Sequence, residues 1–504
     1  MNIKNKIINF KELSNLRKKL KNRKIVLSHG TYDFFHYGHL VHLEESKKFG
    51  DVLVASITAD KFIKKGVNRP IYSQTQRANF LASIKFVDYV VIINSLSAVE
   101  ILKDLKPDIY SKGIEYKIKT NDYTNKINKE INILKKYKGK IFYTDQPVLS
   151  SSNIINNFQI LSNDDVSNFQ KQFKRKTKFA DFQKKFNNLE NKNILVIGDA
   201  IIDEYVFTSA LSKSPKEEII SVKEEKKKIY PGGIFATANN ISNFVKKTTL
   251  ITALDKKNSF YKKIKNKLNK NLVNVFYNDN NVNLSVKTRY LDVSNRKLFQ
   301  TNKLNFKSLE NKTENKILKF LNNNIKKYDL IVVNDFGHGL LTKKIIDYLQ
   351  AYSHKLAVNV QTNSANFGYN FFDKYKKCYY LSLDEPEVRF GIRDRESESK
   401  VLFQKILKKT KSKIISITYG SNGTKVFSQN RIANLPAFSK NVVDTMGAGD
   451  AFFAISSIFI TEDNNPKNIG FIGNLVGALK IQYLGHEKYI DRQSLLGYIK
   501  SFLA

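Results

Sequence analysis

Two stretches of the chain begin alike, each with a short run of apolar and β-branched residues that leads into a glycine-containing turn. The first, KIVLSHGTYDFFHYGH, starts at Lys24, and the second, NILVIGDAIIDEY, starts at Asn193. A buried strand that ends in such a turn is typical of folds in which parallel strands alternate with helices. Since the chain has 504 residues, too many for one ordinary core, we expect two domains, each with its own sheet.

Further strand-like runs alternate with helical patterns after each start. In the first part they are Ile25–Ser28, Val52–Ile57, Tyr89–Ile93, Ile109–Tyr110 and Lys140–Tyr143. In the second part they are Ile194–Ile197, Leu330–Val333, Leu356–Val360 and Ile414–Thr418. This alternation predicts an α/β fold in both halves, with parallel sheets covered by helices. The segment Thr208–Lys228 is an exception, because its alternating pattern predicts a small antiparallel β lid.

The segment between the two halves, residues 163–192, is charged, has Phe at helix-like intervals and lacks Pro and Gly. This composition indicates a helical connector rather than a flexible linker. We therefore predict a first domain at residues 1–160, a helical linker at 161–190 and a second domain at 191–504.

The formal net charge is +39, from 85 Lys and Arg against 46 Asp and Glu. Such an excess can indicate a nucleic-acid or membrane partner, or lysines on solvated faces. We favour the second interpretation, and expect no specific nucleic-acid partner, because the lysines are spread along the chain and no nucleic-acid-binding motif is found. The excess would still attract anionic substrates.

Targeting features are also lacking in the sequence. No run of roughly 18 apolar residues occurs, so we expect no membrane insertion. The basic N-terminal segment has no signal-peptide pattern, and the single cysteine, Cys378, fits a reducing compartment. We therefore expect a cytoplasmic protein.

Four of the seven histidines fall between His29 and His42. Buried core histidines and a metal site are the alternatives, but the i, i+3, i+6 spacing of the last three drifts around a helix and lacks a further ligand. We favour phosphate binding. Gly30 allows close approach of the backbone, and His36 and His39 lie where a helix is expected to begin, a position that attracts phosphate.

The segment H-G-T-Y-D-F-F-H-Y-G-H resembles the G-x-F-D-x-x-H-x-G-H signature of the cytidylyltransferase-like nucleotidylyltransferases, and further motifs follow in the family order from Arg23 to Asn157. The resemblance implies a Rossmann-like domain that joins a sugar phosphate to the α-phosphorus of ATP or CTP, with Mg²⁺, and releases pyrophosphate. It implies catalytic roles for His36, His39 and Lys47 and a substrate-binding role for Arg77. The nucleotide-binding residues that it implies are Gly30, Thr31, Tyr32, Asp33, Lys112, Gly113, Ser150, Ser151 and Ser152.

A second candidate site lies in N-V-V-D-T-M-G-A-G-D-A-F-F-A, which starts at Asn441. Gly447, Ala448 and Gly449 permit a tight turn whose N–H groups converge on an anion. Asp450 would then begin a helix, where its carboxylate can accept a proton from a substrate hydroxyl. The alternative is a plain turn with Asp450 as its N-cap.

This segment resembles D-T-x-G-A-G-D, the signature of the ribokinase-like (PfkB) sugar kinases, and earlier motifs agree from Asn191 onward. The resemblance implies a ribokinase-like α/β domain that uses ATP and Mg²⁺, with Asp450 as the catalytic base and Glu387 and Asp384 at the metal. The residues that it implies for the nucleotide are Thr418, Gly420, Gly423, Gly447, Ala448 and Gly449. Those that it implies for the sugar are Asp203, Gly232, Gly233, Asn240 and Arg289.

Three positions depart from the kinase pattern. Asp384 replaces an Asn, Ala236 stands where a sugar-contacting Asn is usual, and the segment Asn359–Gln361 replaces D-P-K. An extra acid can alter metal affinity, and a lost amide removes one sugar hydrogen bond, worth about 1 kcal/mol in a buried site.

Together the two signatures resemble the bifunctional heptose 7-phosphate kinase and heptose 1-phosphate adenylyltransferase family, here with the order of the domains reversed. The resemblance implies sugar phosphates and nucleoside triphosphates as partners, a nucleotide-activated sugar for surface polysaccharide as product, and a homodimer. The alternative is an active nucleotidylyltransferase with a non-catalytic, sugar-binding kinase-like domain. A nucleic-acid-binding protein, indicated only by the charge, is a third hypothesis.

Overall fold

The computed structural model of the chain describes residues 3–67, 69–95, 97–114, 126–144, 164–213, 220–255, 259–282, 284–304, 306–362, 366–439 and 442–504. The chain divides into two compact units. Unit 1 comprises Met1–Phe179 together with Leu496–Ala504, and unit 2 comprises Ala180–Leu495. The boundary between them follows α8 (Asp164–Lys176) and falls after the first residue of α9 (Phe179–Leu189).

Unit 1 is built on a six-stranded sheet in the order β1-β4-β3-β2-β5-β6, in which every pair is parallel. Its strands are β1 (Ile7–Ile8), β2 (Ile25–Gly30), β3 (Val52–Thr58), β4 (Tyr89–Ile93), β5 (Ile109–Gly113) and β6 (Lys140–Thr144). From β2 the chain moves outward to β3 and β4 and then returns to β5 on the other side of β2. The strand order therefore reverses between β2 and β5, and ligands of open parallel sheets bind at the carboxyl ends of strands at such a point.

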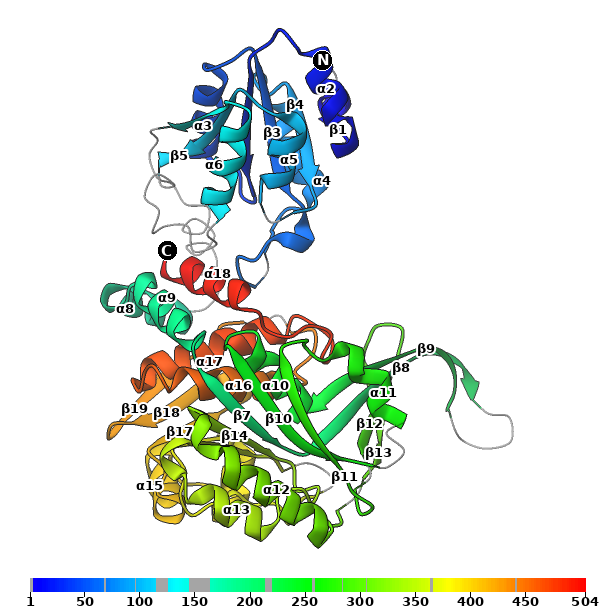
Figure 1. Cartoon of the computed structure of the whole chain (residues 1–504), viewed down its shortest axis with the longest axis vertical. Coiled ribbons are helices and arrows are strands. Elements are labelled where there is room, and N and C mark those ends of the chain that lie inside the picture. Colours follow the sequence, from blue (N-terminus) through cyan, green and yellow to red (C-terminus); the bar gives the residue numbers. More distant parts are fainter. Residues whose placement is uncertain are drawn as a thin grey trace. The chain divides into compact units, whose positions relative to one another are not determined.

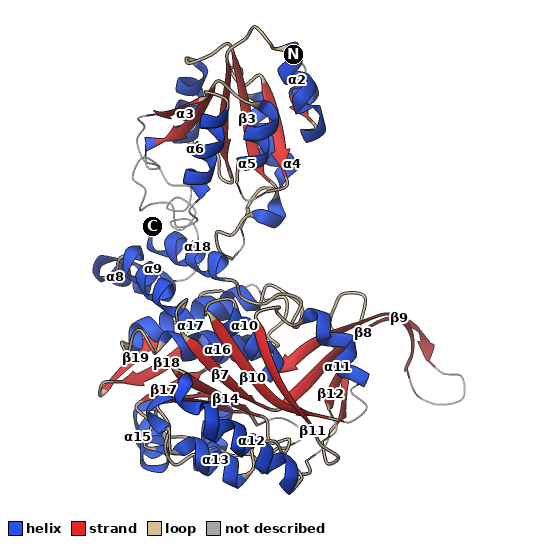
Figure 2. Ribbon diagram, in the orientation of Figure 1, coloured by secondary structure: helices blue, strands red, loops and turns tan. Residues whose placement is uncertain are grey.

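Helices cover both faces of this sheet (Figure 2). They are α1 (Ile3–Lys6), α2 (Leu13–Lys19), α3 (Tyr37–Lys47), α4 (Gln74–Ser83), α5 (Val99–Leu105) and α6 (Lys126–Lys136). Side chains alternate along β2, so that Ile25 and Leu27 join the core against α2 and α5, whereas Val26 joins the core against α3 and α4. Both faces of the strands are buried, which is why they appear in the sequence as continuous apolar runs.

The segment Leu496–Ala504 belongs to unit 1 although it follows the whole of unit 2 in sequence. It forms most of α18 (Arg492–Leu503). Gln170 of α8 donates its side-chain amide to the carbonyl of Phe502 at 2.6 Å. The ring of Tyr498 lies so close to Gly66 that a Cβ there would be 2.5 Å from its Cδ2. Unit 1 is therefore completed by residues from both ends of the chain.

Unit 2 contains a nine-stranded sheet in the order β11-β10-β7-β14-β15-β16-β17-β18-β19, in which all strands except β15 and β16 are labelled in Figure 1. Its strands are β7 (Asn193–Gly198), β10 (Lys247–Leu254), β11 (Leu272–Asn278), β14 (Leu330–Asp335), β15 (Leu356–Val360), β16 (Tyr380–Asp384), β17 (Ile414–Thr418), β18 (Thr424–Ser428) and β19 (Arg431–Leu435). The sheet is parallel up to β17, and β18 and β19 add antiparallel strands at one edge. Here the strand order reverses between β7 and β14.

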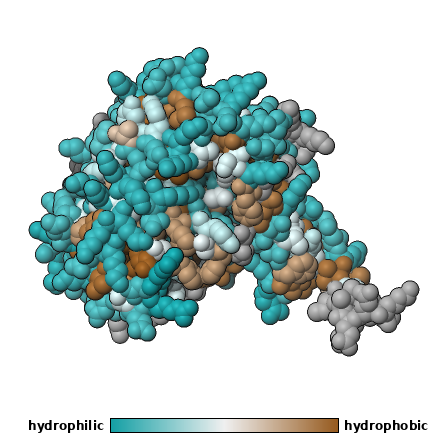
Figure 3. All heavy atoms as spheres, turned by 90° about the horizontal axis from the view of Figure 1, so that it is seen from below, coloured by the Kyte–Doolittle hydropathy of each residue, from teal (hydrophilic) through white to brown (hydrophobic). Residues whose placement is uncertain are grey.

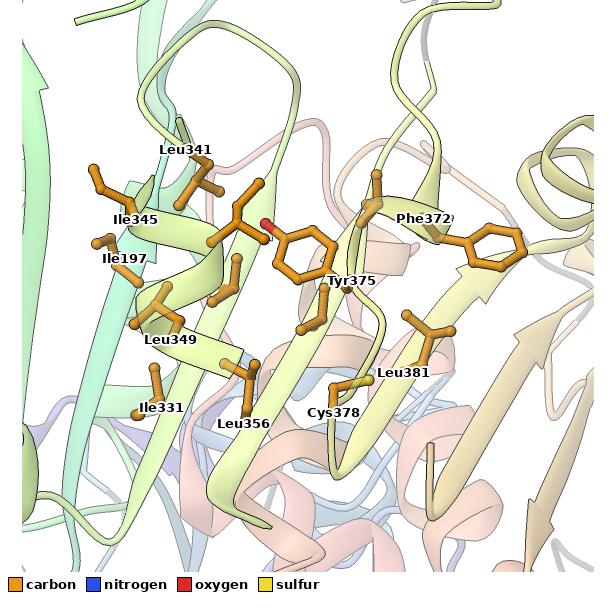
Figure 4. Close-up of a cluster of buried hydrophobic side chains, with 14 of the residues drawn as sticks. Ile197, Ile331, Leu341, Ile345, Leu349, Leu356, Phe372, Tyr375, Cys378 and Leu381 are labelled. Atoms are coloured by element: carbon orange, nitrogen blue, oxygen red, sulfur yellow. The ribbon is translucent and has the colours of Figure 1, made fainter. Parts of the chain in front are cut away.

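The helices of unit 2 form a layer on each face of this sheet (Figure 2). They are α9, α10 (Ile234–Ser242), α11 (Ser259–Ile264), α12 (Asn311–Asn324), α13 (Lys343–Gln350), α14 (Glu385–Ile392), α15 (Ser399–Thr410), α16 (Ala448–Phe459), α17 (Pro466–Lys480) and the start of α18. On one face, Ile345 and Leu349 of α13 pack against Ile331 and Leu356 of the sheet (Figure 4). Because this core fixes β14 and β15 side by side, it also fixes the residues at their carboxyl ends.

A second, four-stranded sheet in unit 2 has the order β13-β12-β8-β9. Its strands are β8 (Ala200–Lys213), β9 (Ile220–Gly233), β12 (Ser285–Leu291) and β13 (Lys297–Lys303). The antiparallel pair β8 and β9 contains the described parts of the predicted lid segment Thr208–Lys228. The α/β fold with a small β lid is thus confirmed, although the lid sheet is larger than the sequence indicated.

The surface is mostly hydrophilic on the face shown in Figure 3, with hydrophobic patches scattered among the polar side chains. None of the helices in the part of the chain that the structure describes is long and apolar enough to cross a membrane.

Candidate active sites

The first candidate site lies at the carboxyl end of β2, where the chain turns into α3. His36 occupies the N-cap position of α3, and its ring stacks on that of His39 with 3.9 Å between centroids and 20° between planes. Both ring nitrogens of His36 and Nδ1 of His39 are buried without a hydrogen-bond partner in the described structure. Unmet polar atoms at a helix N-terminus are suited to bind phosphate oxygens.

Both imidazoles of this pair are electrically neutral near physiological pH. Burial, together with the charges of His36, Lys65 and His42, lowers the pKa of His39 to about 3. Burial and the charge of Lys65 also lower the pKa of His36. Lys65 is the nearby cation, and burial lowers its own pKa to about 8. The site thus offers neutral ring donors with one ammonium group beside them.

A third histidine, His42, is held by hydrogen bonds that the sequence did not reveal. Its Nε2 lies 2.7 Å from Ser28 Oγ, and its Nδ1 lies 2.7 Å from Thr144 Oγ1. Ser28 Oγ in turn lies 2.6 Å from the hydroxyl of Tyr32. The only signal for this role was the position of His42 one helical turn after His39, a spacing shared by any residue on that face.

Two of the predicted ligand-binding residues serve the turn itself. Asp33 is buried, pairs with Arg69 and accepts the N–H of Ile71 at 2.6 Å. Arg77, also buried, donates to the carbonyls of Thr31 at 2.6 Å and Thr58 at 3.0 Å and pairs with Asp60. We therefore expect both residues to hold the shape of the turn, within which Tyr32 has a left-handed φ of 48°.

The remaining predicted residues of this site are placed differently. Lys47 pairs with Asp88 at 2.6 Å, eight residues and about 12 Å along α3 from His39, so the structure does not bring it to the histidine pair. Lys112, at the end of β5, lies 3.5 Å from the carbonyl of His29, and Gly113 follows it. Gly30 and Thr31 form the turn, and Ser150, Ser151 and Ser152 lie outside the described residues.

The second candidate site lies in unit 2, at the start of α16. Gly447 is the N-cap with a left-handed φ of 74°, and a Cβ there would meet the ring of His486 at 2.4 Å. A Cβ on Gly449 would have nothing within 4 Å. Only glycine therefore fits at position 447, whereas open space faces Gly449. The N–H groups of the first turn of α16 lie here, and they have no acceptor within the helix.

Asp450 lies in this first turn and is 9% exposed. Its Oδ1 accepts hydrogen bonds from the side-chain amides of Gln361 at 2.5 Å and Asn334 at 3.2 Å. The predicted catalytic carboxylate thus lies beside the predicted anion-binding turn. Gln361, which we noted only as a departure from the kinase pattern, lies in direct contact with it.

The predicted sugar side of the site is formed by the lid sheet and the glycine pair. Asp203 is buried, pairs with Arg289 at 2.5 Å and lies 3.4 Å from His486. Burial alone would raise the pKa of Asp203, but the contacts with His486 and Arg289 lower it overall. A Cβ on Gly232 would lie 2.0 Å from Asp203 Oδ2, and Gly233 has a φ of 52°, so both positions require glycine.

Asn240 does not present its amide to the site. Its Nδ2 donates to the carbonyl of Ala236 at 3.0 Å, and its Oδ1 accepts the N–H of Ile490 at 2.8 Å.

Two residues near Asp450 were not predicted as site residues. Lys287 of β12 has no hydrogen bond or ion pair among the described residues, yet it interacts electrostatically with Asp203 and Asp450. His338 is 6% exposed, and neither of its ring nitrogens has a partner there. Burial, together with the charge of Lys287, lowers the pKa of His338 to about 4. Their proximity depends on how β12 and β14 are placed, which the local sequence does not encode.

The predicted nucleotide and metal residues follow β16 and β17. Gly423, with a φ of 88°, ends the turn after Thr418, and a Cβ there would clash with the carbonyl of Leu435 at 2.0 Å; Gly420 has a φ of 55° and open space around it. Glu387 accepts the N–H groups of Thr362 at 3.1 Å and Asp384 at 2.7 Å. Burial raises the pKa of Glu387 to about 8, so a neighbouring cation would favour its charged form.

Comparison with known families agrees with this geometry. Residues 191–490 match the family described as pfkB family carbohydrate kinase, which is more than half of the chain. The chain belongs to the pfkB family of carbohydrate kinases. The part of this pfkB chain that precedes the kinase match, residues 27–157, matches the cytidylyltransferase-like family. Both predicted families, and their order along the chain, are confirmed.

Curated relatives match the pfkB chain over short segments. The "Bifunctional protein HldE" of Campylobacter jejuni is 43% identical over 121 residues, or 24% of this chain and 26% of the relative. The protein of the same name from Nitratiruptor sp. is 39% identical over 138 residues, or 27% of this chain and 30% of the relative. The matches thus span less than a third of each relative. Among solved structures, a ribokinase from Giardia lamblia has a TM-score of 0.49 and 13% identity, and the match covers 60% of this chain and 99% of the ribokinase.

Proposed function

We propose that the chain is a bifunctional enzyme that makes a nucleotide-activated sugar. Unit 2 transfers the γ-phosphoryl group of ATP to a hydroxyl of a sugar or sugar phosphate. Unit 1 joins a sugar 1-phosphate to ATP or CTP and releases pyrophosphate. The observation that carries this proposal is that each unit has a helix N-terminus at its topological switch point, flanked by side chains suited to phosphate chemistry: His36 and His39 in unit 1 and Asp450 in unit 2.

In the kinase reaction, Asp450 accepts the proton of the substrate hydroxyl as its oxygen bonds to the γ-phosphorus. The bond from that phosphorus to the bridging oxygen breaks, and ADP leaves. The N–H groups at the start of α16 hold the transferred group, because the turn at Gly447 and Gly449 leaves them open. Asp203 and Arg289, held together as a buried pair, position the sugar.

Magnesium fits the oxygen donors of unit 2. Mg²⁺ is usually bound by one or two carboxylates together with phosphate oxygens and water, and Asp384 and Glu387 are adjacent carboxylates at the start of α14. These two residues would hold the ion, which supplies charge neutralisation for the triphosphate. The extra acid at Asp384 adds to this donor set and does not oppose it.

In the transferase reaction, a phosphate oxygen of the sugar phosphate attacks the α-phosphorus of the nucleotide. That oxygen is already anionic at neutral pH, so no general base is required. His36 and His39 donate hydrogen bonds to the phosphates and to the leaving pyrophosphate, and Lys65 adds positive charge beside them. A neutral imidazole still has one N–H to donate, so the lowered pKa values are compatible with this role.

The kinase acceptor that we favour is a sugar phosphate. Lys287 interacts electrostatically with Asp450 and Asp203 and also with His338, whose ring nitrogens have no hydrogen-bond partner in the described structure. A cation beside such ring nitrogens would attract a second phosphate on the substrate. Because of the family resemblance, heptose 7-phosphate is the first acceptor to test for the kinase, and heptose 1-phosphate is the first substrate to test for unit 1. The alternative, a kinase-like unit that binds sugar without catalysis, is less favoured because Asp450 and its turn are intact.

The test is an activity screen with purified protein that reports pyrophosphate and ADP separately. Pyrophosphate should appear from ATP or CTP only with a sugar 1-phosphate and should disappear in His39→Ala. ADP should appear from ATP with a sugar or sugar phosphate and should disappear in Asp450→Ala. Full activity in both variants would contradict the proposal. Sugar binding without ADP formation in the unmodified protein would favour the non-catalytic alternative.

A further inference from the structure

The carboxylate of Asp450 is held unevenly by its surroundings. Its Oδ1 accepts two amide hydrogen bonds, from Gln361 Nε2 at 2.5 Å and Asn334 Nδ2 at 3.2 Å. Its Oδ2 has no hydrogen-bond donor among the described residues. One oxygen is therefore fixed by the protein, and the other is left to accept a proton from a substrate.

The orientation of the Asn334 amide follows from this contact. An ionised carboxylate only accepts hydrogen bonds, so the nitrogen of Asn334 must face Asp450. The same nitrogen lies 3.0 Å from Thr237 Oγ1. Asn334 Oδ1 is then buried without a partner in the described structure, although an unmet buried acceptor is costly. A substrate hydroxyl beside the carboxylate would satisfy it.

Gln361 divides its roles between backbone and side chain. Its N–H donates to the carbonyl of Asp335 at 2.9 Å, and its carbonyl accepts the amides of Asn366 and Asn370, both at 3.1 Å. These contacts anchor the segment after β15. The only hydrogen bond of the side chain that the structure describes is the one to Asp450. Replacing the side chain therefore leaves the local backbone anchored and removes one contact with the base.

The structure assigns Gln361 and Asn334 as positioning residues of the kinase reaction: they hold Asp450 Oδ1 so that Oδ2 takes the proton. This assignment rests on the kinase activity proposed above. It gives a function to the neutral glutamine at position 361. The side chain orients the base without adding charge next to it.

Charged and titratable groups surround Asp450 on other elements. They are Lys287 of β12, Glu387 in the first turn of α14, Lys480 of α17, and His486, whose ring lies against Gly447. All of them stay in place in a Gln361 variant. A change of charge at position 361 alone therefore moves the acid limb of the kinase pH profile in a direction set by its sign.

The experiment measures ADP formation from ATP and heptose 7-phosphate between pH 5 and 9, using the full chain and the variants Gln361→Met, Gln361→Lys and Gln361→Glu. Gln361→Met keeps size and removes the donor, so kcat should fall about tenfold while KM for ATP stays within about twofold. A cation favours the ionised, proton-accepting carboxylate, so Gln361→Lys should move the acid limb of kcat/KM to lower pH. Gln361→Glu should move it to higher pH, each by about one pH unit.

Gln350→Met is the matched control, since Gln350 accepts the backbone N–H groups of Lys376 and Lys377 and has no hydrogen bond to Asp450 in the described structure. It should leave kcat and the profile unchanged, and unfolding midpoints identify any variant that does not fold. The Met, Lys and Glu variants place a neutral, a positive and a negative side chain at position 361. If one of them does not fold, the other two still show the sign of the shift. If the acid limb is the same in all Gln361 variants while Asp450→Asn abolishes ADP formation, the assignment is wrong and the kinase proposal stands. If the unmodified chain forms no ADP, both fail.

Discussion

At the start of α3, the side chains beside the turn are two stacked, uncharged imidazoles, whereas at the start of α16 the turn is followed by a carboxylate. Both helices begin at the carboxyl ends of parallel strands, near the place where the strand order reverses. The backbone at both sites therefore offers an anion the same kind of N–H groups. The difference matches the two proposed nucleophiles. A sugar phosphate oxygen is already ionised and needs donors, whereas a sugar hydroxyl must lose a proton and needs an acceptor.

The largest expected effect separates the two sites by removing the acceptor. Asp450→Asn keeps the shape of the side chain but cannot take a proton, so kinase kcat should fall about 10³-fold. Pyrophosphate release by unit 1 should be unchanged, and the two products can be measured in the same sample. A parallel loss of both products would mean that the sites do not act independently.

The reciprocal change removes a donor from the first site. His39→Ala leaves the triphosphate without one fixed hydrogen bond and exposes the ring of His36, so pyrophosphate release should fall about 10²-fold. ADP formation is the internal control and should persist. His42→Ala should cost less, because His42 contacts Ser28 and Thr144 and lies one turn further into the helix.

A glycine substitution tests the sugar side of the second site. Gly232→Ala would bring a methyl group to within 2.0 Å of Asp203 Oδ2 and displace that carboxylate, so KM for the sugar substrate should rise about tenfold while KM for ATP changes little. The matched control is Gly477→Ala in α17, where a Cβ would meet nothing within 4 Å. That variant should keep full activity and gain slightly in stability.

The smallest effect concerns stability and pH in the first site. Burial lowers the pKa of His39 to about 3 and that of His42 to about 4, whereas both titrate near pH 6.5 when unfolded. Below pH 6.5 the unfolded state thus binds more protons than the folded state, so the free energy of unfolding falls as the pH falls toward 4. Each histidine should lower the free energy of unfolding by up to about 1.4 kcal/mol per pH unit. Denaturant unfolding of His39→Asn/His42→Asn should show a shallower pH dependence; an unchanged slope would contradict the neutral imidazoles.

The strands were predicted best where both faces of the sheet are covered. Tyr89–Ile93, Leu356–Val360 and Ile414–Thr418 have the observed bounds of β4, β15 and β17, because strands buried on both sides appear as continuous apolar runs. By contrast, β13 is exposed along its whole length and was not predicted. Its sequence, KLFQTNK, has no buried face to impose a pattern.

Some site residues can likewise be predicted from a short stretch of sequence, whereas others depend on contacts between residues far apart in the chain. Gly447, Gly449 and Asp450 form one short motif whose role follows from a local turn and helix start. Gln361 lies 89 positions from Asp450, and Asn334 lies 116 positions away. Their contact with the base follows from the placement of β14 and β15 in the sheet, which no local pattern encodes.

The ninth-from-last residue, Leu496, begins a segment that completes unit 1 only after all of unit 2 has been translated. At bacterial and eukaryotic elongation rates that interval is on the order of tens of seconds. During it, the loop around Gly66 would emerge from the ribosome without the ring of Tyr498. Nascent unit 1 would thus await its last helical turns until the end of the chain has been made.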